Sequence, residues 1–283
     1  MTIDYNTFKR FCPSSATPSD ELFDMFQTAI RHSLEYVRGL AGEDIASRLD
    51  EVEDIPVLVS ARDVVSGLAA AAAAYVCNRA YADTVPHLDL ILTSTGFGVV
   101  SNENVAPASA ERVQRLTKAL EVSACRAHDA LVFALLMFPE WRDSDQARGL
   151  LSSLFWNNAH FFMLGLSEPT ASQIAQLRPK NVFAEAELAS FISPEMSACL
   201  LKSMRHPDEN TTLMYSVMSS CRRYVAAHVA GDSAGMGRLR HAVLELLTAH
   251  AEELPAFRDS SVYAAIKSSR YENKEDDPCY FFV

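Results

Sequence analysis

Residues 88–109, LDLILTSTGFGVVSNENVAPAS, are the one stretch in which an otherwise helical sequence changes to the pattern of β-strands. Apolar and β-branched residues fill two short runs, 88–93 and 97–101, and Ser94-Thr95-Gly96 lies between them. A glycine between two such runs is typical of a hairpin turn that needs a positive φ. The sequence therefore predicts a mainly α protein with one short β-hairpin near residues 88–101.

Long helical patterns lie on both sides of this stretch. The first covers residues 21–40, and the second is alanine-rich, with Ser60 as its expected cap and its end near Tyr81. A third pattern starts after Ser109, a good N-cap residue, and continues to Phe138. Long helices that each have an apolar face predict a helical bundle.

The second half of the chain shows the same periodicity with clear punctuation. Ser193-Pro194 predicts a helix start, and Arg178-Pro179 predicts a helix stop because proline lacks the backbone N–H. Residues 231–237 contain three glycines but lack the Lys-Ser/Thr of a phosphate loop, so we interpret them as a helix–helix connection capped by Asp232 or Ser233.

An aromatic-rich break with glycine and proline, residues 156–169, is the expected boundary between the two halves. We predict an N-terminal helical subdomain with the hairpin at 1–165, a C-terminal helical subdomain at 166–271 and a flexible tail at 272–283.

Composition excludes several classes of function. The net charge of −11 and the lack of clustered cations argue against a nucleic-acid-binding protein. The most apolar segment, residues 64–76, is shorter than the roughly 20 residues that span a bilayer, so no membrane contact is expected. The N-terminus lacks an apolar signal region, so we expect a cytoplasmic protein.

No catalytic, cofactor-binding or metal site is predicted. The six cysteines are scattered without a CxxC pair, and the eight histidines form no HExxH motif. Gly96-Phe97-Gly98 lacks the third glycine of a dinucleotide-binding motif. His128 and Asp129 are neighbours, but adjacent helical residues point about 100° apart and cannot orient one another. We therefore expect no cofactor.

Two segments are candidates for assembly. The hairpin offers exposed strand edges, and the aromatic residues at the C-terminus follow a charged segment that makes burial in their own core awkward. The predicted interaction residues are Thr95, Gly96, Phe97, Gly98, Asn102, Asn104, Tyr280, Phe281 and Phe282.

The run TSTGFGVVSNENVAPAS with the following AERVQRL, and the ending SSRYENKEDDPCYFFV, resemble the signatures of an uncharacterised family encoded in Bacteroidetes phages and prophages. Members of that family look like virion structural proteins. A helix pair followed by a hairpin and further helices is also similar in outline to head–tail adaptor proteins, which form rings beneath the portal.

The resemblance implies a non-enzymatic phage or prophage structural protein, a head–tail connector or adaptor that assembles into a ring. Its expected partners are other copies of itself and phage portal or tail proteins, first in the host cytoplasm and then in the virion. The alternatives are a helical enzyme or small-molecule-binding protein with an unrecognised site, and a host-encoded helical scaffold.

Overall fold

The computed structural model has the predicted mainly α fold with one short β-hairpin. The chain divides into two compact units, one formed by Met1–Ser152 with Trp156–Leu177 and the other by Ser153–Phe155 with Arg178–Val283. Separate folding of residues 1–165 and 166–271 stays a prediction. The structure describes residues 1–12, 20–57, 63–88, 90–93, 96–99 and 109–269.

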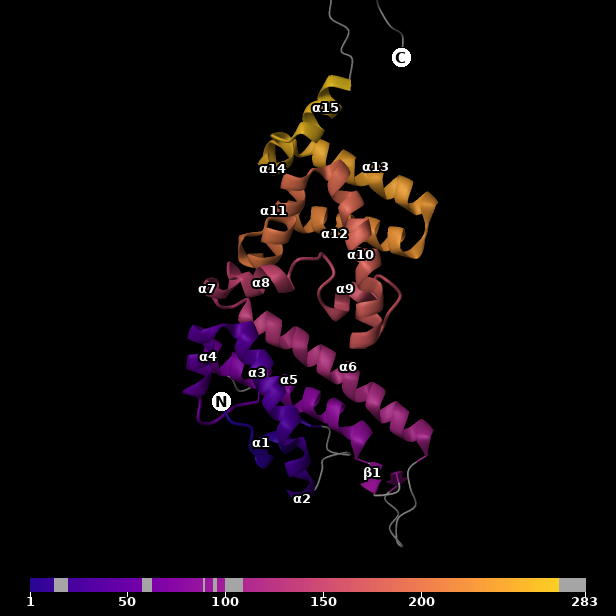
Figure 1. Cartoon of the computed structure of the whole chain (residues 1–283). Coiled ribbons are helices and arrows are strands. Elements are labelled where there is room, and N and C mark those ends of the chain that lie inside the picture. The colour runs from indigo at the N-terminus through magenta and orange to yellow at the C-terminus, as the bar shows by residue number, and fades with distance from the viewer. Residues whose placement is uncertain (13–19, 58–62, 89, 94–95, 100–108, 270–283) are drawn as a thin grey trace, which may run out of the picture. The chain divides into compact units, whose positions relative to one another are not determined.

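The first unit consists of helices joined by short connections and by the hairpin (Figure 1). Its 3-10 turns lie at Asp24–Phe26 and Val85–His87. Its α-helices are α1 (Tyr5–Phe11), α2 (Asp20–Phe23), α3 (Gln27–Ala41), α4 (Glu43–Asp50), α5 (Val64–Thr84), α6 (Ala110–Leu135), α7 (Pro139–Arg142), α8 (Asp145–Leu150) and α9 (Asn158–Phe162).

Helix α5 forms the centre of this unit because its surface is apolar nearly all round. Six consecutive alanines, residues 69–74, present little side-chain bulk, and α3 and α6 both pack against the helix. The cap is Asp63, and the predicted cap at Ser60 is wrong. Asp63 and Ser66 hydrogen-bond each other's backbone N–H groups, and this reciprocal capping box fixes the start of α5 at Val64.

The hairpin connects α5 to α6. Strands β1 (Leu90–Thr93) and β2 (Gly96–Val99) are antiparallel, and their register runs from Leu90 opposite Val99 to Thr93 opposite Gly96. Gly96 therefore belongs to a strand, which corrects its expected role as the turn glycine. Only residues 94–95 separate the strands, because the pairing extends one residue further toward the turn than the apolar pattern indicated.

The second unit contains most of α10 (Ala171–Ile192) and the helices that follow it. Short 3-10 turns lie at Pro207–Glu209 and Ala251–Glu253. The remaining helices are α11 (Pro194–Arg205), α12 (Thr212–Ala230), α13 (Ser233–Ala249), α14 (Pro255–Arg258) and α15 (Ser261–Ser269).

Helix α10 continues through Pro179, so the helix stop predicted at Arg178-Pro179 is wrong. Proline removes the hydrogen bond to the carbonyl of Ala175, four residues earlier. Ala175 and residues 178–180 are exposed, so water can solvate this carbonyl and reduce the cost of proline inside the helix.

A tight turn joins α12 to α13, as predicted for this glycine-rich segment. Gly231 ends α12 in the left-handed conformation at φ +73°. Asp232 caps α13, because its carboxylate accepts a 2.8 Å hydrogen bond from the backbone N–H of Gly235. The turn lets α12 and α13 pack against each other.

Candidate functional site

Of the two segments predicted to take part in assembly, the structure describes the strands of the hairpin. Gly96, Phe97 and Gly98 lie in β2, at register positions opposite Thr93, Leu92 and Ile91. The other predicted interaction residues, Thr95, Asn102, Asn104, Tyr280, Phe281 and Phe282, lie outside the described residues.

The two strands form a sheet of their own. Within the described part of the chain, β1 pairs only with β2, so each strand has an outer edge without a partner strand. A two-residue connection closes on a hydrogen-bonded pair, which here is Thr93 with Gly96. Hydrogen-bonded and non-hydrogen-bonded pairs alternate along an antiparallel ladder. Leu92 and Phe97 form the next pair, which is not hydrogen-bonded, so their backbone N–H groups face the outer edges. Such edges are templates for pairing with another chain.

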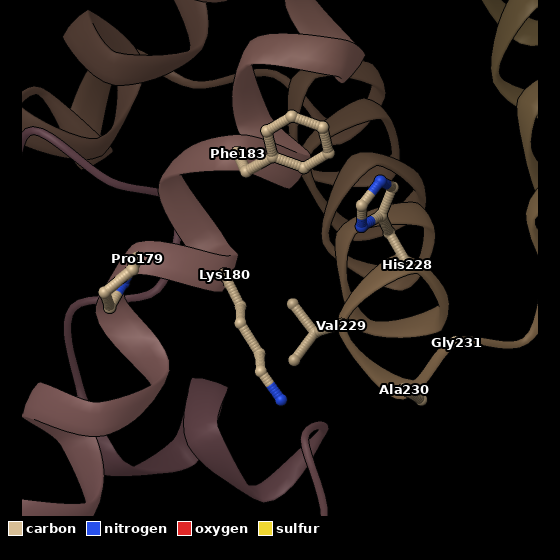
Figure 2. Close-up of a pocket in the computed structure, with 7 residues that line it drawn as sticks. All are labelled: Pro179, Lys180, Phe183, His228, Val229, Ala230 and Gly231. Carbon is tan, nitrogen blue, oxygen red and sulfur yellow. The ribbon is translucent and has the colours of Figure 1, made fainter.

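A second candidate site is a shallow pocket of about 480 Å³ in the second unit (Figure 2). It lies between α10 and the C-terminal end of α12. Figure 2 shows the Lys180 side chain extending toward Val229, with Phe183 and His228 on the same side of the hollow. The lining is mostly apolar and consists of Pro179, Lys180, Phe183, His228, Val229, Ala230 and Gly231.

A hydrogen-bonded cluster fixes one wall of this pocket. Glu187 of α10 accepts a hydrogen bond from the Tyr224 hydroxyl at 2.8 Å, and its other carboxylate oxygen lies 2.8 Å from Nε2 of His228. The hydrogen bond from Tyr224, followed by that from His228, lowers the pKa of Glu187 below its ordinary value. The Phe183 ring lies 5.5 Å from the imidazole of His228. The cluster therefore holds His228 in one orientation.

The sequence contained a signal for this cluster that our sequence analysis missed. Phe183 and Glu187 are four residues apart on α10, and Tyr224 and His228 are four residues apart on α12. Residues at this spacing share one face of a helix. The spacing alone cannot show that the two faces meet.

A partly exposed aromatic cluster in the first unit surrounds His128. Its Nε2 lies 2.8 Å from the Tyr36 hydroxyl, and the ring packs edge-on against Tyr75. Burial lowers the pKa of His128. Asp129 instead accepts a 2.7 Å hydrogen bond from the backbone N–H of Asn158. The two neighbours thus have different partners, as their positions on the helix predicted.

The described thiols show no sign of reactivity, and the described residues offer no metal site. The described cysteines are free, and burial raises the pKa of Cys12 to about 12, which disfavours the reactive thiolate. Among the described residues, no group of three His, Cys, Asp or Glu side chains could hold a metal ion. No helix in the described ranges is long and apolar enough to cross a membrane.

Large apolar side chains are also exposed on the first unit. Phe133 lies in the last turn of α6 and Met137 lies two residues after the helix ends, with 52% and 60% of their surfaces exposed. The Phe133 ring lies 5.0 Å from that of Trp156. Phe162 of α9 is 67% exposed. Exposed aromatic groups of this size are typical of protein contact surfaces.

Comparison with known proteins found one similarity. Residues 38–149 match the model of a family described as a family of unknown function (DUF6712). The matched segment lies within the first unit and includes α4, α5, the hairpin and α6. Comparisons with curated proteins and with solved structures found no significant match. The match thus assigns similarity to an uncharacterised family, and any function must be argued from the site.

Proposed function

We propose that the protein is a non-enzymatic structural protein of a phage or prophage, a head–tail connector or adaptor that assembles with copies of itself into a ring. The observation that carries this proposal is the hairpin between α5 and α6, whose outer strand edges have no partner strand within the described residues. Sequence resemblance to phage virion proteins supports the same function.

The hairpin is placed to act as a contact between subunits. Helices α5 and α6 pack extensively against each other, and Figure 1 shows β1 at the ends of these two helices. A two-stranded hairpin is only marginally stable by itself in water. Addition of a strand from a neighbouring copy would satisfy outer-edge backbone groups and stabilise the hairpin. A rigid helix pair that presents such an edge suits repeated assembly.

The surface of the chain fits a partner that is protein and not nucleic acid. The net charge of −11 disfavours contact with DNA phosphates, and an acidic wall lets DNA pass a ring without sticking. The proposed partners are therefore other copies of this chain and portal or tail proteins, in the host cytoplasm during assembly and then in the virion.

Two measurements test the proposal. Sedimentation and negative-stain electron microscopy of the purified protein should show closed rings, either alone or after mixing with the adjacent portal protein. The gene should lie beside portal, capsid or tail genes. A gene within a metabolic operon, together with a protein that forms no ring under either condition, would refute the proposal.

The alternative is a helical enzyme or small-molecule-binding protein. The observation that favours it is the pocket beside His228, where Glu187 orients the imidazole as in a base–orienter pair. The described residues that line the pocket include no Ser, Thr or Cys that could act as the nucleophile. Stoichiometric binding of a small molecule that His228→Gln abolishes would support this alternative.

A further inference from the structure

We propose that the pocket between α10 and α12 binds the C-terminal residues Cys279–Val283 of a second copy of the chain. This inference rests on the proposed self-assembly and names one contact that would hold neighbouring copies together. It is carried by the chemistry of the pocket and by that of the segment that ends the chain.

The pocket offers an apolar surface that water contacts. Phe183 is 66% exposed, although it is a large aromatic residue, and Val229 and Ala230 line the hollow beside it. Figure 2 shows that the Phe183 ring lies at one end of the hollow, while the Lys180 side chain reaches along it. An aromatic ring laid against Phe183 would bury apolar surface and add ring–ring contact.

The wall of the pocket is already in place for a ligand. Glu187 binds both Tyr224 and His228 at 2.8 Å, and His228 in turn packs against Phe183 at 5.5 Å. A site held in this way loses little conformational entropy when it binds. The volume of about 480 Å³ is ample for an aromatic side chain and too small for a folded domain.

The charge of the pocket favours an acidic occupant. Lys180 lines it, and the exposed Arg178 lies two residues earlier on α10. The acidic groups beside it are already engaged, since Asp232 accepts the Gly235 N–H and Glu187 holds its two partners. An incoming carboxylate would therefore meet a cationic site.

The C-terminal segment contains both the acidic and the aromatic residues that this pocket favours. Residues 272–277, ENKEDD, contain four acidic residues and one lysine, and Tyr280-Phe281-Phe282 follow two residues later. The rings would pack against Phe183 and Val229, and the acidic residues that precede them would lie near Lys180.

The occupant is a second copy because a ring needs two different surfaces that fit one another. A head-to-tail contact closes into a ring when one patch of a subunit binds a different patch of its neighbour. The pocket and the C-terminal segment are two such patches. Once copies are held together at the hairpin, the high local concentration of the segment strengthens this second contact.

The test uses a variant of the full chain in which Tyr280, Phe281 and Phe282 are each changed to Ser. Without these rings, the C-terminal segment of the variant cannot compete for the pocket. A fluorescent peptide of residues 269–283 carrying Cys279→Ser is titrated onto it, and binding is followed by anisotropy. We expect saturable binding that weakens at least tenfold with Phe183→Ser and at least threefold with Lys180→Glu. Val182→Ser is the matched control, since Val182 is 57% exposed on the same helix and does not line the pocket.

The outcomes separate this inference from the proposed function. Failure of the peptide to bind, or equal binding to the Phe183→Ser and Val182→Ser variants, would overturn the inference. Rings that form normally with Phe183→Ser would also overturn it, while leaving the proposed function intact. The peptide is also titrated onto the unmodified chain at concentrations where this chain is monomeric. If the peptide does not bind there, the chain's own C-terminal segment fills the pocket, and a second copy is the wrong occupant. Circular dichroism checks that each variant is folded.

Discussion

The carboxylate of Glu187 lies 2.8 Å from the imidazole Nε2 of His228, and this contact joins α10 to α12 across 41 residues of sequence. Tyr224 donates to the other oxygen of the same carboxylate. One acidic side chain therefore holds together two helices and one wall of the pocket.

Glu187→Gln should destabilise the protein at neutral pH and much less in acid. Hydrogen bonds from Tyr224 and His228 lower the pKa of Glu187, so the stabilisation it gives is present above its ordinary value of 4.5 and is lost as pH falls through the lowered pKa. Because the side chain is 39% exposed, solvent limits the effect at pH 7 to about 1 kcal/mol. Urea unfolding at pH 7 and pH 3 measures it, with the exposed Glu35→Gln as control. An equal loss at both pH values would contradict the assignment.

Asp129→Asn should have the opposite effect. Burial raises the pKa of Asp129 to about 6 from an ordinary value of 3.8, although the Asn158 N–H works against the shift. Between these values the folded state binds a proton that the unfolded state has lost, so this group makes the protein less stable as pH rises from about 4 to about 6. The neutral variant should gain about 1–3 kcal/mol at pH 7 and little at pH 4.

The same unfolding series gives the check, with the exposed Asp24→Asn as control. A variant that is less stable than the parent at pH 7 would show that the hydrogen bond from Asn158 outweighs the cost of burying the carboxylate.

Much of the fold could be predicted because its signals are local. Ser193-Pro194 gave the start of α11, and the structure shows the Ser193 hydroxyl accepting the Met196 N–H. The change from helical to strand periodicity likewise located the hairpin. The continuation of α10 through Pro179 could not be predicted in this way, since it depends on whether the carbonyl left without a donor is exposed to water.

The pocket could not be predicted for a related reason. Its chemistry comes from side chains on two helices, and the contact between Glu187 and His228 depends on how α10 and α12 pack. The spacing within each helix was visible, but a shared face predicts a contact surface without naming its partner. The predicted interaction residues at the C-terminus lie outside the described part of the chain, so their role stays a proposal.

Ala72→Leu should destabilise the first unit by about 1–3 kcal/mol, because added methylenes in a close-packed core force strain on the neighbours. Ala72 is fully buried in the core centred on α5. Ala119→Leu, at an exposed position on α6, is the matched control and should have almost no effect. Thermal unfolding followed by circular dichroism compares them. Equal midpoints would show that α5 has free space beside it.

Gly231→Ala and Gly237→Ala should change stability in opposite directions. Gly231 has φ +73°, so a Cβ there should cost about 1 kcal/mol. Gly237 lies inside α13 with nothing within 4 Å of an added Cβ, so alanine should stabilise that helix by about 0.5–1 kcal/mol. Urea unfolding of both variants tests the pair. Stabilisation by Gly231→Ala would mean that the left-handed cap is not needed.

The last prediction concerns the edge of the hairpin. The register places the Leu92 N–H on the outer edge of β1, away from Phe97. Leu92→Pro removes that donor and leaves the hydrogen bonds between β1 and β2 in place. If a neighbouring copy pairs with this edge, the variant should fold normally but assemble about tenfold more weakly, since an intermolecular hydrogen bond contributes roughly 1 kcal/mol and proline also obstructs the approaching strand.

Leu92→Thr is the matched control, because it also loses the leucine side chain but keeps the N–H. Sedimentation over a range of concentrations compares the two variants with the unmodified chain. Equal assembly of Leu92→Pro and Leu92→Thr would exclude the β1 edge, and the same comparison at Phe97 would then test the β2 edge. If neither proline weakens assembly, copies of the chain do not associate by strand pairing at the hairpin.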